Sequence, residues 1–272
     1  MGGLAFLISI TLSLTVSSLF LLNTERKAAG LSIIISLIFC LCNSLIGIID
    51  DFTKLKRKEN AGLTPTQKLF FQFIFAILFL MARRHFCGDT TVIELSLGKI
   101  DFGLLYYPVA IILLLGVINC ANLTDGIDGL ASSVALTIGA VFLFIGSSNT
   151  EISLLSAALM GGVLGFLLFN VHPAKIFMGD TGSLFLGAAT ACLAFSLGNP
   201  LIIILIGGVY VIEGISVILQ VAIYKATGKR VFKMAPLHHH LEKCGIEESR
   251  ICVIAVAVTL FLSALALFVL EK

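Results

Sequence analysis

Five aspartates stand at the ends of apolar segments, where a carboxylate is costly without a partner. Asp50 and Asp51 end one apolar run, and Asp125 and Asp128 lie in NLTDGIDG, the short segment after another run. Asp180 stands in MGDTGS, just before a further run. Carboxylate and amide oxygens are the ligands that Mg²⁺ prefers, so the pattern predicts a magnesium site drawn from several segments.

Basic side chains beside these aspartates indicate what the cation would serve. Lys54 and Lys58 follow the aspartate pair in DDFTKLKRK, and Lys68 comes soon after. Mg²⁺ with several lysines is typical of a diphosphate site, and the sequence contains no Walker A or dinucleotide motif. Each aspartate alone would also suit a helix cap or a membrane boundary. Their number and shared setting favour Mg²⁺-dependent phosphoryl transfer.

Three consecutive histidines, His238, His239 and His240, lie in MAPLHHHLE. Neighbouring helical residues diverge by about 100°, and neighbouring strand residues point to opposite faces. Three adjacent rings therefore rarely converge on one ion, and the sequence does not predict a histidine metal cage.

The composition requires a membrane protein. The chain is 58% hydrophobic and only 12% charged, and its mean hydropathy is +1.07. These values predict a single all-α domain over residues 1–272, a polytopic transmembrane bundle. The seven cysteines include no CxxC pair, which argues against a disulfide framework, and a net charge of +2 does not indicate nucleic acid.

Apolar runs near the roughly 20-residue length of a spanning helix recur along the chain. We expect about nine spans, at residues 2–22, 31–49, 67–82, 104–121, 130–147, 152–169, 183–197, 200–224 and 251–270. The alternating stretch TVIELSLGKIDFG at 91–103 predicts a small hairpin between two spans.

Lysine and arginine predict the orientation. The loops at 50–66 (with Lys68), 170–182 and 225–250 carry twelve of them, and the other side carries six. By the positive-inside rule the first set is cytoplasmic. The five aspartates lie on that side, so the active site is expected at the cytoplasmic face.

Four motifs resemble one enzyme family. DDFTKLKRKENAGLTPTQK, NLTDGIDGLA, FNVHPAKIFMGDTGS and MAPLHHHLE are similar, in order, to those of the phospho-N-acetylmuramoyl-pentapeptide transferases, within the polyprenyl-phosphate N-acetylhexosamine-1-phosphate transferase superfamily. The resemblance implies transfer of phospho-MurNAc-pentapeptide from UDP to undecaprenyl phosphate, giving lipid I and UMP in peptidoglycan synthesis. It also implies the bacterial cytoplasmic membrane.

The same resemblance implies roles for individual residues. Asp180 resembles the Mg²⁺ ligand, with Asn122 as a second contact to the metal or diphosphate. Asp50, with Asp51 beside it, resembles the residue that deprotonates or orients the lipid phosphate. The residues implied to contact substrate are Lys54, Lys58, Lys68, Asn122, Asp125, Asp128, Asn170, Phe177, His238, His239 and His240.

The sequence departs from the family at its start, and several alternative functions stay open. The family carries a further span and a K-x-G-T-P-T-M-G-G segment, and this sequence begins at its MGG. We therefore expect the 272 residues alone to be poorly active. The alternatives are a sister transferase using UDP-GlcNAc, and a secondary transporter, which would place its charges inside the spans. A homodimer also stays open, because the sequence does not determine the oligomeric state.

Overall fold

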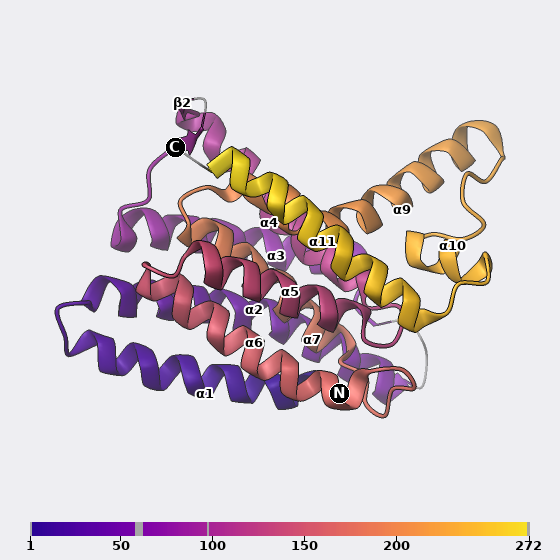
Figure 1. Cartoon of the computed structure of the whole chain (residues 1–272), viewed down its shortest axis with the longest axis horizontal. Coiled ribbons are helices and arrows are strands. Elements are labelled where there is room, and N and C mark those ends of the chain that lie inside the picture. The colour runs from indigo at the N-terminus through magenta and orange to yellow at the C-terminus, as the bar shows by residue number, and fades with distance from the viewer. Residues whose placement is uncertain (1, 58–61, 97, 271–272) are drawn as a thin grey trace.

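The protein is an all-α bundle with one small β-hairpin (Figure 1). The computed structural model describes residues 2–57, 62–96 and 98–270. In chain order the elements are α1 (Gly3–Leu22), α2 (Lys27–Arg57), α3 (Pro65–Ala82), η1 (Arg83–Cys87), β1 (Val92–Leu95), β2 (Gly98–Asp101), η2 (Gly103–Leu105), α4 (Tyr106–Thr124), α5 (Leu130–Ile145), α6 (Thr150–Asn170), α7 (Gly179–Ser196), η3 (Pro200–Ile202), α8 (Ile203–Ile206), α9 (Gly208–Thr227), α10 (Leu237–Lys243) and α11 (Glu248–Leu270). The predicted fold class is confirmed.

Each of the nine predicted apolar segments is helical. Among the described residues, seven helical segments are long and apolar enough to cross a membrane. The two others are α5, with 16 residues, and α7, whose first turn carries Asp180. Helix α7 is buried along most of its length and packs against α1, α2, α4 and α6, so it forms the centre of the bundle.

The prediction of one continuous span over 200–224 is wrong. The segment begins with η3 and α8 and is interrupted at Gly207, after which α9 begins. Two consecutive glycines, Gly207 and Gly208, stand at the break. Glycine weakens a helix because its backbone has more conformational freedom than that of other residues. In Figure 1 α9 extends away from the other long helices.

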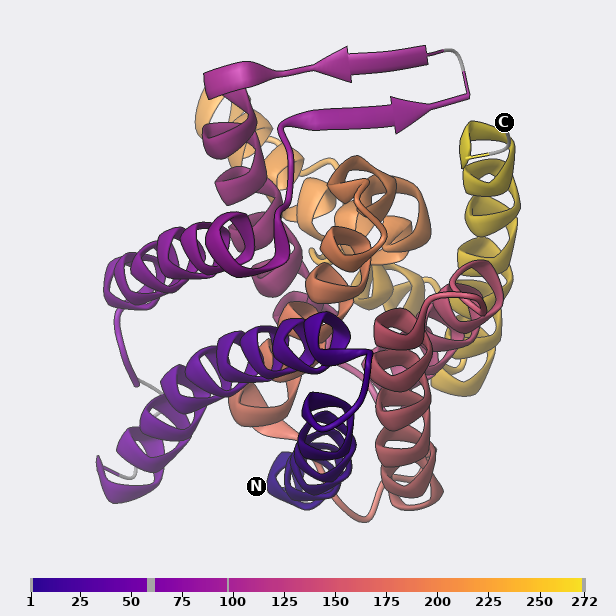
Figure 2. The ribbon, with the colours of Figure 1, turned by 90° about the vertical axis from the view of Figure 1, so that its left-hand side faces the viewer.

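The predicted hairpin is confirmed. Strands β1 and β2 pair antiparallel, with Ile93 opposite Ile100. In Figure 2 the hairpin reaches from the start of α4 toward the C-terminal end of α11. There the backbone N–H of Ser96 donates to the carbonyl of Val269 at 2.9 Å.

A buried ion-pair network ties the helices together at the end of the bundle opposite the Asp50 end of α2. Arg83 donates to Glu151 and Ser32, each at 3.0 Å, and pairs with Asp89 at 2.6 Å. Arg83 and Glu151 are only 4% and 8% exposed. Arg83 also donates to Ser196 of α7 at 3.4 Å. Buried charges are tolerated when they are paired in this way, so the network fixes the relative positions of α2, α3, α6 and α7.

Two local features bring α2 and α3 to the first turn of α7. Gly47 of α2 lies against the backbone of Asp180 and Thr181 with no space for a side chain, so the helices cross closely one turn before Asp50. Helix α3 begins with a capping box, in which the Thr64 hydroxyl accepts from the Gln67 N–H and the Gln67 side chain accepts from the Thr64 N–H. This cap places Lys68 in the first turn of α3.

Candidate active site

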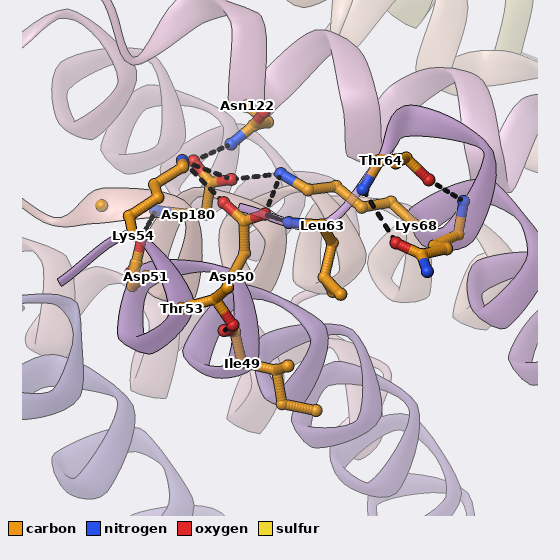
Figure 3. Close-up of polar contacts among 12 residues, drawn as sticks. Ile49, Asp50, Asp51, Thr53, Lys54, Leu63, Thr64, Lys68, Asn122 and Asp180 are labelled. Carbon is orange, nitrogen blue, oxygen red and sulfur yellow. Dashed lines mark hydrogen bonds and ion pairs between the residues drawn. The ribbon is translucent and has the colours of Figure 1, made fainter. Parts of the chain in front are cut away.

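Two carboxylates and two ammonium groups form the centre of the site (Figure 3). Asp50 is fully buried, and its Oδ2 lies 2.6 Å from Lys54 Nζ, while its Oδ1 lies 3.1 Å from Lys68 Nζ. Asp180 lies across from it, with Oδ2 at 2.5 Å from Lys68 and 3.4 Å from Lys54. Asp50 Oδ1 also accepts from the Leu63 N–H at 2.6 Å. Helices α2, α3 and α7 therefore meet at one polar point.

Asp51 holds the start of α7. Its Oδ1 accepts from the backbone N–H of Asp180 at 3.2 Å. Its Oδ2 accepts from the Thr181 N–H at 3.1 Å and from the Thr181 hydroxyl at 2.7 Å. A carboxylate at a helix N-terminus satisfies free N–H groups and complements the helix dipole. Asp51 thereby fixes the turn that carries Asp180.

Asn122, at the end of α4, reaches the same point. Its Nδ2 donates to Asp180 Oδ1 at 3.1 Å and to Ser183 Oγ at 2.7 Å. Asn122 therefore contacts Asp180 through its amide nitrogen, and its predicted contact to the metal or diphosphate stays a prediction. Ser183 was not singled out from the sequence beyond its place in the turn TGS.

The pKa of the Asp125 carboxyl group reflects the negative charge of the neighbouring carboxylates. Burial, followed by the charges of Asp180 and Asp51, raises the pKa of the Asp125 carboxyl to about 8. The three carboxylates of Asp50, Asp51 and Asp180 outnumber the two lysines of the cluster, Lys54 and Lys68, so negative charge is in excess. Oxygens of Asp50, Asp51 and Asp180 lie within 4.8 Å of one another. A hard, oxygen-binding divalent cation fits this donor set and would remove the excess.

Asp128 lies in a second cluster, apart from these residues. Its Oδ2 accepts from the Ala174 N–H at 2.9 Å and lies 3.1 Å from His172 Nδ1. Its backbone N–H donates to Glu248 Oε2 at 2.9 Å, and this oxygen is 3.5 Å from His172. Two distant segments, at His172–Ala174 and at Glu248, thus hold Asp128, and only Asp128 in this cluster was predicted as a substrate contact.

The end of α6 and the loop before α7 place two further predicted contacts in different environments. Phe177 is 65% exposed, so its ring is free to stack on a ligand. Asn170 is 3% exposed, with Oδ1 accepting from Ser132 at 2.8 Å and Nδ2 donating to the Ile176 carbonyl at 2.9 Å. This geometry favours a role for Asn170 in shaping the loop, and its predicted substrate contact stays a prediction.

The three histidine rings have three different neighbours. His238 is fully buried, with Nδ1 3.2 Å from Glu213 Oε2, and its ring packs on Gly126, where no side chain would fit. His239 Nδ1 lies 2.5 Å from Glu242, and His240 Nδ1 accepts from the Lys233 N–H at 3.1 Å. His238 therefore joins the histidine segment to Gly126 of the NLTDG loop, and to α9 through Glu213, an acid set inside an apolar run.

The predicted contact Lys58 lies outside the described residues. The contacts missed from the sequence are Leu63, Thr181, Ser183, Glu213, His172 and Glu248. Most act through a backbone group or as a distant partner. Only Glu213, a lone carboxylate within an apolar stretch, carries a sequence signal of its own.

A largely apolar cavity of about 500 Å³ opens beside the cluster. Lys68 and Asn122 stand at its polar end, and side chains of α3, α4 and α9 form its walls. These wall residues include Leu69, Leu115, Val217 and Ile218. The cavity suits an amphiphile with an anionic head and an apolar tail.

Comparison with known proteins agrees with this arrangement. The glycosyl transferase family 4 model matches residues 33–198. A phospho-N-acetylmuramoyl-pentapeptide-transferase of Halalkalibacterium halodurans is 45% identical over 271 residues, which cover 98% of this chain and 82% of the relative. Proteins with the same name from Clostridium botulinum strain Alaska E43 and Acetivibrio thermocellus are 41% and 40% identical, over 96% and 100% of this chain and 79% and 81% of their own lengths. The chain therefore belongs to glycosyl transferase family 4 and, within it, to the phospho-N-acetylmuramoyl-pentapeptide-transferases.

Proposed function

We propose that this multi-pass membrane transferase moves phospho-MurNAc-pentapeptide from its UDP carrier to undecaprenyl phosphate, giving lipid I and UMP. The observation that carries the proposal is the convergence of Asp50, Asp180, Lys54, Lys68 and Asn122 beside an apolar cavity. Carboxylates and lysines suit a diphosphate with its cation, and the cavity suits the polyprenyl acceptor.

The donor set favours Mg²⁺ as the cofactor. Asp180 would hold the cation, with the amide oxygen of Asn122 as a further ligand. The cation would neutralise charge on the diphosphate and on the departing UMP. Asp51 keeps Asp180 in place through the first turn of α7, and Ser183 anchors the Asn122 amide.

The acceptor phosphate is proposed to lie at Lys68, with the first isoprenoid units in the cavity between α3, α4 and α9. A phosphate monoester has a second pKa near 6, so at pH 7 it is already largely a dianion. Little proton remains for a base to remove. Asp50 then acts mainly by fixing Lys54 and Lys68, which lie 2.6 and 3.1 Å from its oxygens. We therefore propose that the lipid phosphate attacks the donor directly and in line, without a covalent enzyme intermediate.

Donor recognition is proposed at the rim. Phe177 offers an exposed ring for stacking on uracil, and Asp128 has its Oδ1 for a hydrogen bond. His239 and His240 are partly exposed and would donate to phosphate or muramoyl groups, whereas the buried His238 holds the segment. The lysine and arginine distribution supports a cytoplasmic position for this face, in the bacterial cytoplasmic membrane. A homodimer is left open.

The test supplies the chain in membranes with UDP-MurNAc-pentapeptide, a polyprenyl phosphate and Mg²⁺. Mass spectrometry should find the lipid-linked phospho-MurNAc-pentapeptide together with UMP. Preferential use of UDP-GlcNAc would instead support a sister transferase. Product formation without release of UMP would contradict the proposed reaction.

A further inference from the structure

The last two turns of α9 project from the bundle with no buried side. Every residue from Val221 to Val231 is exposed, and in Figure 1 this end of α9 extends away from the other long helices. Val221, Ile223 and Tyr224 lie in this part, 46%, 36% and 52% exposed. In a membrane protein, apolar side chains on all sides of a projecting helix contact lipid, and tyrosine favours the interface.

Three cations stand at the tip of this helix. Lys225, Lys229 and Arg230 are all exposed, and within the described part of the chain none of them forms an ion pair. Two other exposed cations do have acid partners, since Arg250 lies 3.2 Å from Glu247 and Lys99 pairs with Glu94. The tip of α9 therefore presents uncompensated positive charge next to apolar side chains.

A cavity of about 390 Å³ lies between α9 and the segment that returns to α10. Lys225, Arg230 and Tyr224 line it together with apolar groups of Val217, Val221 and Met234. One part of its wall is cationic and the rest is largely apolar. This is the chemistry of a phospholipid with an anionic headgroup and an acyl chain.

We propose that this surface binds an anionic phospholipid of the surrounding bilayer, with its headgroup on Lys225 and Arg230 and an acyl chain along Val217, Val221 and Met234. The site differs from the cavity beside Lys68, with which it shares only Val217 among their lining residues. This assignment rests on the proposed function, which places the acceptor phosphate at the Asp50–Asp180 cluster. The tip cations are therefore assigned to a bilayer lipid.

Bound lipid would also stabilise the segment that leads to the histidines. Gln220, another residue of the cavity wall, accepts from the N–H groups of Val231 and Phe232 at 3.1 and 2.9 Å. Its Nε2 donates to the Phe232 carbonyl at 3.3 Å. The same residue thus contacts both the lipid surface and the segment entering α10.

The test compares lipid retention by native mass spectrometry of the full chain from mixed micelles. The probes are phosphatidylglycerol and phosphatidylcholine of equal chain length. Lys225→Gln with Arg230→Gln removes the proposed headgroup contacts. Lys56→Gln with Lys243→Gln removes the same charge from two exposed positions elsewhere that form no ion pair among the described residues, and serves as the matched control. Size-exclusion profiles verify that both variants are folded.

The wild type and the control should retain phosphatidylglycerol in preference to phosphatidylcholine. In the Lys225/Arg230 variant this preference should be about 30-fold smaller, because the variant lacks two cations that each attract an anionic headgroup. An unchanged preference in this variant overturns the proposal. An equal loss in the control also overturns it, because general charge attraction then explains the binding. Displacement of phosphatidylglycerol by a short polyprenyl phosphate at equal concentration would reassign the surface to the acceptor.

Discussion

Removing one hydroxyl from the first turn of α7 should weaken catalysis without touching a substrate contact. The Thr181 hydroxyl is fully buried and donates to Asp51 Oδ2 at 2.7 Å. Thr181→Val keeps nearly the same volume and removes this bond. Asp51 then keeps only two backbone donors, and the turn carrying Asp180 loses one of its constraints.

The structure sets the size of the effect. A hydrogen bond to a charged group contributes about 1.5–3 kcal/mol, and about 1.4 kcal/mol corresponds to a factor of ten. If half or more of this free energy holds Asp180 in place, kcat should fall by about tenfold. The Mg²⁺ concentration for half-maximal activity should rise, because Asp180 is the proposed ligand.

Helix α7 provides its own control. Thr190 is also fully buried, and its hydroxyl has no hydrogen-bond partner among the described residues. Thr190→Val should leave kcat and the Mg²⁺ midpoint within about twofold, since no bond is lost. The assay is initial rate of UMP release against Mg²⁺ for both variants. Equal behaviour of the two variants would refute the positioning role of the Thr181–Asp51 bond.

Three further predictions concern the carboxylates. Asp50→Asn should lower the rate by about tenfold or more at every pH, and recovery between pH 6 and 9 would favour a general base instead. The pKa of Asp125 is raised to about 8, so cation binding should release the proton of this carboxyl group. The affinity for Mg²⁺ should therefore increase from pH 6 to about pH 8 and stay constant above it. Asp125→Asn should make the affinity nearly independent of pH over this range. Glu248→Gln weakens the bond from the Asp128 N–H, so it should raise KM for the UDP donor about fivefold at nearly constant kcat, and a loss confined to kcat would be inconsistent with donor positioning.

Hydropathy and motif order predicted the bundle well because membrane burial leaves a direct trace in composition. The nine apolar segments became helices, and the alternating stretch became a hairpin. The break at Gly207 was missed because the apolar run 200–224 continues through it, and hydropathy does not register an interrupted helix. The glycine pair marks the break in the sequence, but hydropathy averaged over many residues does not reveal it.

The aspartates could be identified from their residue type and position in the sequence, but the partners that each one contacts could not. Asp51 accepts bonds from the start of α7, whereas its neighbour Asp50 faces the lysines. Asp128 was grouped with the other aspartates, and the fold places it with His172 and Glu248. Adjacent residues on a helix point in different directions, and partners 44 to 130 residues away leave no local signal. Only the packing of the helices decides these pairs.

The most direct test of the central claim is divalent-cation binding, measured with Mn²⁺ as a spectroscopic substitute for Mg²⁺. Electron paramagnetic resonance of the purified chain should show one tightly bound Mn²⁺ that Mg²⁺ displaces. Asp180→Asn should lose this ion and turnover together, while Asp128→Asn, in the second cluster, should keep the ion. Full Mn²⁺ binding by Asp180→Asn, or its loss in Asp128→Asn instead, would contradict a cation site at the meeting point of α2, α4 and α7.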